Sequence, residues 1–122
     1  MKGYEYFKKF LDEENFRYDE DEDTIICKYQ GWKYVGWKND SPYFQLTVVF
    51  FDVDNSNINK CLRAANELNN EIFIIKTTVR GDSVWCNYEF IPNESFDSEF
   101  FLQIMHQIVN ACDKFNEKMK NN

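Results

Sequence analysis

The segment 52–57, Asp-Val-Asp-Asn-Ser-Asn, begins like a calcium-binding loop, with alternating oxygen donors. Such a loop needs glycine at its sixth position and a bidentate glutamate at its twelfth. Those positions hold Asn57 and Arg63, and the cation of Arg63 would repel calcium. We therefore interpret the segment as a strand-to-helix turn whose polar side chains cap the following helix.

The remaining nucleophilic and metal-ligating residues form no catalytic motif. His106 is the single histidine, and helical geometry turns it away from the apolar stripe of its predicted helix, toward solvent. The four cysteines stand at positions 27, 61, 86 and 112. They include no C-x-x-C pair, so the sequence supports neither a zinc knuckle nor a thioredoxin-like motif. We predict reduced thiols that behave as small apolar side chains, and a protein with no catalytic residues, bound metal or cofactor.

The charge balance restricts the possible partners. The chain has 14 basic and 21 acidic residues, a formal net charge of -7. The acidic balance argues against nucleic acid as a partner, because phosphate binding needs clustered Lys and Arg. No signal peptide and no apolar run of about 18 residues is present, so we expect a cytoplasmic protein without a membrane span. Five consecutive acidic residues at 19–23 predict a solvated loop.

Aromatic residues are unusually frequent, at 18% of 122 residues. Aromatic side chains suit half-buried strand surfaces and also protein interfaces, so they predict either an aromatic core or an aromatic binding face on a sheet. The candidate partner-binding residues are Trp32, Tyr34 and Trp37 in one predicted hairpin and Phe44 in the next strand. Trp32 and Tyr34 share one face of the hairpin and Trp37 points to the other if the pairing is regular. Packing of these residues against helices is the competing interpretation.

Hydrophobic periodicity predicts the elements that must position these side chains. Apolar residues every three or four positions predict helices, and alternating segments predict strands. Gln30-Gly31 is a predicted two-residue hairpin turn, and Gly36 indicates a bulge or a close backbone approach. The result is an α+β domain spanning residues 1–122, with a single five-stranded antiparallel sheet and three helices in the order α-β-β-β-α-β-β-α. The helices are expected at 3–14, 57–69 and 97–119, and the strands at 24–29, 32–38, 43–53, 72–79 and 84–91.

Four short sequence motifs, taken in their order along the chain, resemble those of a known family. They are Asn-Phe-Arg-Tyr at 15–18 before the acidic run, Cys-Lys-Tyr-Gln-Gly-Trp-Lys-Tyr at 27–34, Ala-Ala-Asn-Glu-Leu-Asn at 64–69, and Val-Trp-Cys-Asn-Tyr-Glu at 84–89. Their order and spacing resemble the bacterial YbjN-like family, named as sensory transduction regulators, within the type III secretion chaperone-like fold. The resemblance implies a helix-sheet-helix module that often dimerises and binds other proteins, and it brings no catalytic residues.

Two functional hypotheses follow. The first is a non-enzymatic protein-binding adaptor or chaperone-like regulator of bacterial origin, which binds another protein or a peptide segment and forms a homodimer. The alternative is a small-ligand-binding domain with a pocket between the sheet and the helices, where polar groups such as Arg80, Asn87 and Glu89 would converge. A solid apolar interior between sheet and helices would count against the alternative.

Overall fold

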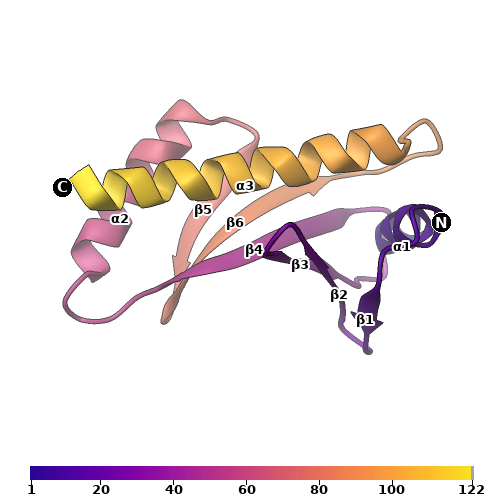
Figure 1. The fold of residues 1–122 in the computed structure, drawn as a ribbon, viewed down its shortest axis with the longest axis horizontal. Coiled ribbons are helices and arrows are strands. Elements are labelled where there is room, and N and C mark those ends of the chain that lie inside the picture. Colours follow the sequence, from indigo (N-terminus) through magenta and orange to yellow (C-terminus); the bar gives the residue numbers. More distant parts are fainter. Residues whose placement is uncertain (122) are drawn as a thin grey trace.

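The computed structural model describes residues 1–121, which contain three helices and six strands. Helix α3 runs along the length of the molecule, and the two termini lie at opposite ends (Figure 1). In chain order the elements are α1 (Gly3–Glu13), β1 (Tyr18–Glu20), β2 (Thr24–Tyr29), β3 (Trp32–Trp37), β4 (Phe44–Asp52), α2 (Ile58–Glu71), β5 (Ile75–Arg80), β6 (Ser83–Phe90) and α3 (Ser98–Asn121).

All six strands belong to one antiparallel sheet with the order β1-β2-β3-β4-β6-β5. The α+β class and the three helices agree with the prediction from sequence, but the sheet has six strands rather than five. The additional strand is β1, which pairs with β2 at the edge of the sheet and places Tyr18 opposite Cys27. The pairing of β4 with β6 joins the first and second halves of the chain.

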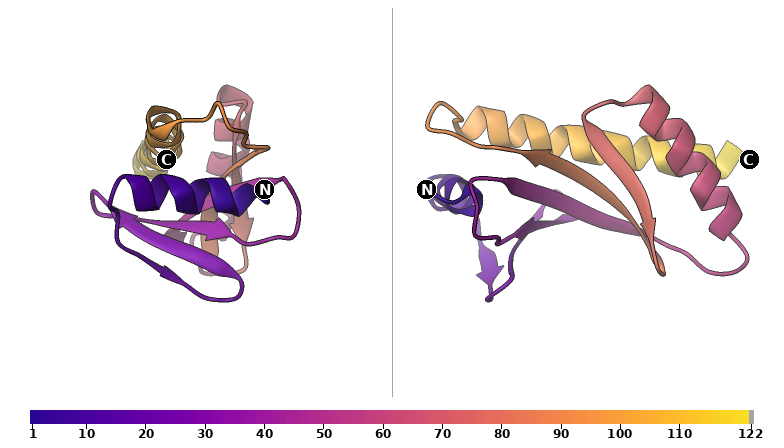
Figure 2. Two further views of the ribbon diagram at one scale, coloured as in Figure 1. Left: turned by 90° about the vertical axis from the view of Figure 1, so that its right-hand side faces the viewer. Right: turned by 180° about the vertical axis from the view of Figure 1, so that it is seen from behind.

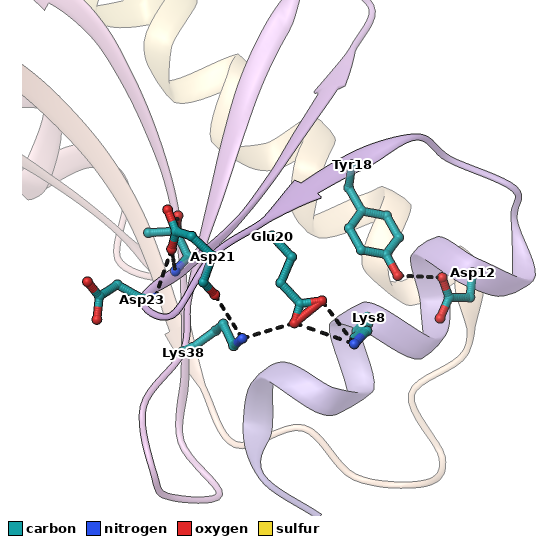
Figure 3. Close-up of polar contacts among 8 residues, drawn as sticks. Lys8, Asp12, Tyr18, Glu20, Asp21, Asp23 and Lys38 are labelled. Atoms are coloured by element: carbon teal, nitrogen blue, oxygen red, sulfur yellow. Dashed lines mark hydrogen bonds and ion pairs between the residues drawn. The ribbon is translucent and has the colours of Figure 1, made fainter.

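Strand β1 includes part of the acidic run, for which the sequence predicts a solvated loop. Asp19 and Glu20 lie in the strand because cations from outside the run neutralise Glu20. The Nζ atoms of Lys8 in α1 and of Lys38 after β3 each lie 2.9 Å from a carboxylate oxygen of Glu20 (Figure 3). Hydrogen bonds from Lys8 and then Lys38 lower the pKa of the Glu20 carboxyl. The rest of the acidic run forms the turn into β2.

The three helices cover one face of the sheet (Figure 2). Alternate side chains of the strands point toward the helices and meet the apolar stripe of α3 there. Rings from three elements pack at one end of this core, where the centroid of Phe7 lies 5.2 Å from that of Phe44 and 6.0 Å from that of Phe101. Six of the seven residues of the predicted stripe are buried, and the seventh, Met119, is partly buried and packs against the core. The six are Phe101, Ile104, Met105, Ile108, Cys112 and Phe115.

Two glycine-containing features have the local roles that the sequence suggests. Gln30 and Gly31 both have positive φ values, 51° and 83°, as a two-residue turn of type I′ requires. Gly36 marks a close approach, because an added Cβ would lie 2.9 Å from the Cζ atom of Phe44. The bulge is in β4 instead, where the register with β6 shifts between Val49 and Phe51.

Strand β5 begins three residues later than predicted. Helix α2 continues to Glu71, two residues beyond its predicted end, so the chain must turn before it can enter the sheet. This connection leaves two large apolar side chains in solvent: Phe73 is 90% exposed and Ile74 is 63% exposed.

Candidate functional site

The side of the sheet opposite the helices, which we call the outer face, carries every second side chain of the strands. The register between neighbouring strands identifies the residues of this face. Ile26 pairs with Val35, Val35 with Thr47, and Thr47 with Asn87. Within residues 1–121 no helix covers this face (Figure 2). Besides these four, its members at the centre of the sheet are Trp37, Gln45, Val49, Lys76, Thr78, Arg80, Trp85 and Glu89.

Two tryptophans meet at the centre of the outer face. The rings of Trp37 in β3 and Trp85 in β6 are stacked, with centroids 5.7 Å apart and planes inclined by 15°. Because β4 lies between β3 and β6, the two rings must meet above the outer side chains of β4. The guanidinium carbon of Arg80 lies 4.7 Å from the ring centroid of Trp85, a cation–π distance.

A buried polar network lies beneath this tryptophan pair. Thr47 is 0% exposed and Asn87 is 1% exposed, although no described helix lies over them. The indole Nε1 of Trp37 donates to Thr47 Oγ1 at 3.0 Å, and Thr47 Oγ1 donates to Asn87 Oδ1. Gln45 Nε2 donates to the same Oδ1 at 2.8 Å. Nothing within residues 1–121 accepts from Asn87 Nδ2, so a buried donor is left unpaired, which costs about 1–3 kcal/mol.

The edges of the sheet offer less room for a partner than the outer face. The carboxamide of Asn69 in α2 bonds the backbone of Thr77 in β5 twice: Thr77 N–H donates to Oδ1 and Nδ2 donates to the Thr77 carbonyl, each at 2.8 Å. The side chain thereby occupies the backbone groups of Thr77 that an added strand would use in the middle of β5. The opposite edge strand, β1, has three residues. Short edges and covered edges both resist the addition of a further strand.

The structure separates the four candidate partner-binding residues. Tyr34 is 2% exposed and its hydroxyl donates to the Met105 carbonyl, while Phe44 is 0% exposed, so both side chains belong to the core. Trp32 is half-buried and packs against the same core. Trp37 alone of the four lies on the outer face, as strand alternation indicates. The sequence does not indicate its stacking partner Trp85, because no local pattern in β6 shows that only β4 separates β6 from β3 in the sheet.

The histidine, the cysteines and the acidic residues of segment 52–57 form no catalytic or metal-binding group in the described residues. His106 is exposed on α3, as predicted. In segment 52–57 the carboxylate of Asp54 accepts hydrogen bonds from the hydroxyl and the backbone N–H of Ser56, at 2.6 and 2.8 Å, which lower the pKa of Asp54. All four cysteines are buried free thiols. In the part of the chain that the structure describes, no group of three His, Cys, Asp or Glu side chains could hold a metal ion.

The interior between the sheet and the helices is filled by apolar side chains. The polar groups that a ligand pocket would need there, Arg80, Asn87 and Glu89, lie on the outer face instead. An open hollow of about 760 Å³ lies beside β1 and β2 and is lined by Phe16, Arg17, Tyr18, Asp19, Ile26 and Lys28. The geometry therefore gives no support to a small-ligand pocket between sheet and helices.

Fold and site together define a class: an α+β domain whose helices cover one face of an antiparallel sheet and whose other face is aromatic and, in the described residues, free of helices. The family model described as "T3SS (YopN, CesT) and YbjN peptide-binding chaperone 1" matches residues 5–122. The chain belongs to this family of peptide-binding chaperone domains, which confirms the resemblance to YbjN-like proteins. Within residues 1–121 no helix has the length and apolar character needed to cross a bilayer.

A solved structure shows the same fold. The crystal structure of YbjN from E. coli superposes with a TM-score of 0.70 at 11% sequence identity, over 93% of this chain and 87% of that one. At this level of identity the similarity concerns the fold alone. A search of curated proteins found no match.

Proposed function

We propose that this protein is a non-enzymatic, chaperone-like adaptor of bacterial origin that binds an extended segment of another protein in the cytoplasm. Membership of a peptide-binding chaperone family supports a peptide or protein partner. We place the binding site on the outer face because Trp37, Trp85 and Arg80 are grouped there and no described helix covers them. Trp and Arg are enriched among the residues that contribute most to binding at protein interfaces.

The outer face suits an extended segment better than the sheet edges do. Strand addition uses unpaired backbone groups along an edge, and Asn69 already occupies those of Thr77 in β5. A segment lying on the outer face would instead place its side chains on half-exposed rings. A tryptophan provides a large contact area with few rotatable bonds, so little conformational entropy is lost on binding.

The test is binding of the full chain to an array of synthetic peptides of varied composition. We expect a subset of peptides to be retained, and we expect the double substitution Trp37→Ala/Trp85→Ala to weaken retention by about tenfold or more. His106→Ala is the control, because His106 is exposed on α3, on the other side of the sheet from the outer face. Circular dichroism of the double variant would verify that it is folded. Equal retention by the double variant, or no retained peptide, would refute the assignment.

The proposal includes a homodimer. Ile58 and Leu62 lie one turn apart on α2 and are 36% and 50% exposed, and Phe73 and Ile74 are exposed in the connection that follows. Exposed apolar side chains of this kind favour self-association. Light scattering over a range of protein concentrations should give a mass near twice 14.7 kDa, and Leu62→Glu should shift it toward the monomer. A monomeric mass at every concentration would refute the dimer.

A further inference from the structure

The outer face differs in charge from the rest of the molecule. The chain carries a net charge of -7. Strand alternation places four cations and three carboxylates on the outer face, so the acidic excess lies elsewhere. The cations are Lys28, Lys33, Lys76 and Arg80, and the carboxylates are Asp19, Asp52 and Glu89.

The two cations nearest to the tryptophan pair are both on β5. Lys76 and Arg80 lie four residues apart on the same side of the strand, and Arg80 is held over the ring of Trp85. Glu89 is the carboxylate on the neighbouring strand, and it faces the hydroxyl of Tyr43: burial, and then the interaction with Glu89, raise the pKa of Tyr43 to about 12. On the β5 side of Trp85 the charged side chains of the outer face are therefore both cations, in a protein that is acidic overall.

The unpaired amide of Asn87 lies beside one of these cations. Lys76 is the direct cross-strand partner of Asn87 in the β5–β6 register. Side chains at directly opposed positions have Cβ atoms about 4.5–5.5 Å apart. The oxygen of the Asn87 carboxamide is occupied from the β4 side by Thr47 and Gln45, while its Nδ2 has no acceptor within residues 1–121. An unpaired N–H donor and an ammonium group side by side can both donate hydrogen bonds to the same anionic acceptor, such as a carboxylate.

We propose that the outer face selects an acidic extended segment of the partner protein. A glutamate or aspartate of that segment accepts the hydrogen bond from Asn87 Nδ2 and pairs with Lys76, while a neighbouring side chain packs on the Trp37–Trp85 pair. This inference rests on the proposed function and names the chemistry of its peptide. No described helix lies above Asn87, so only side chains of the outer face need to move to admit the carboxylate.

The experiment compares two end-blocked, dye-labelled peptides of equal length that share their Phe and Val residues and differ only in carrying Glu or Lys at the remaining positions. The net charge of -7 by itself would favour the Lys peptide. We expect the opposite: fluorescence anisotropy should show the Glu peptide bound about tenfold or more tightly than the Lys peptide, because local complementarity outweighs the distant charges. Addition of the Glu peptide should also shift the side-chain amide signals of Asn87 in a ¹⁵N–¹H NMR spectrum.

A matched pair of charge reversals locates the interaction. Lys76→Glu should weaken binding of the Glu peptide by about tenfold, whereas Lys9→Glu, which makes the same charge change on exposed helix α1, should not. Equal affinity for the two peptides, preference for the Lys peptide, or equal effects of the two reversals would overturn the acidic preference. Failure of both probe peptides while arrayed peptides bind would overturn this inference and leave the proposed function standing; failure of the array as well would overturn both.

Discussion

The double hydrogen bond between Asn69 and Thr77 leads to a quantitative prediction about the closed edge of β5. Thr77 is 2% exposed, so replacing Asn69 by alanine leaves its backbone N–H and C=O without their partner. Each buried group left unpaired costs about 1–3 kcal/mol. Asn69 is itself half-buried, so water reaches the vacated position in part and the lower half of the range applies to each group.

The matched control is Asn70→Ala, at the exposed neighbouring position of the same helix. Both substitutions gain about 0.5 kcal/mol of helix propensity, so this contribution cancels in the comparison. We expect Asn69→Ala to be less stable than Asn70→Ala by about 2–4 kcal/mol in urea unfolding followed by circular dichroism. A difference below about 0.5 kcal/mol would refute the conclusion that this carboxamide stabilises the edge of β5.

The variant Asn69→Asp separates the two hydrogen bonds. Its carboxylate still accepts the Thr77 N–H but faces the Thr77 carbonyl with a second acceptor, which favours the protonated acid and raises the pKa of that carboxyl. A carboxyl whose pKa is raised in the folded state destabilises the fold fully above that pKa. The penalty decreases as the pH falls from there and vanishes below the ordinary pKa of the unfolded chain. The stability of Asn69→Asp relative to Asn69→Ala should therefore increase in acid. No pH dependence of this difference would contradict the assigned geometry.

Three further predictions follow from packing and charge. Gly36→Ala should lower the free energy of unfolding by about 1–3 kcal/mol, because the new Cβ meets the ring of Phe44 in a filled core; an unchanged urea midpoint would contradict this. Because the pKa of Glu20 is lowered by Lys8 and Lys38, its charge stabilises the fold above its ordinary pKa of 4.5, and this contribution is lost as the pH falls through the lowered value. The stability difference between wild type and Glu20→Gln should accordingly be largest near neutral pH and vanish in strong acid, and a pH-independent difference would argue against the ion pairs. A thiol reagent such as Ellman's should react only as the chain unfolds, and rapid labelling of native protein would show that the core opens; the thiols concerned are Cys27, Cys61, Cys86 and Cys112.

Local patterns in the sequence predict the helices and most of the strands. The stripe of α3 is visible because seven apolar residues repeat with the helical period, and the β2–β3 hairpin is visible because Gln30-Gly31 suits a turn with two positive φ values. The α+β class follows from the order of such elements, and strand alternation alone places Trp37 on the face opposite Trp32 and Tyr34. Each of these features depends on residues within a few positions of one another.

Contacts between distant segments decide the remaining features. Five adjacent carboxylates predict a loop, and β1 forms because Lys8 and Lys38 neutralise Glu20 from outside that run. Burial of Tyr34 and Phe44 depends on where α1 and α3 pack, which no local pattern encodes.

The candidate site itself arises from the pairing of β6 between β4 and β5. That pairing brings Trp85 within stacking distance of Trp37, 48 positions earlier in the chain, and sets Lys76 beside Asn87. The sequence by itself determines which face of each strand a residue occupies, because side-chain alternation is a property of the extended backbone. The tertiary structure decides which strands become neighbours, because that depends on the burial of the whole apolar surface at once, and it thereby assembles the outer face.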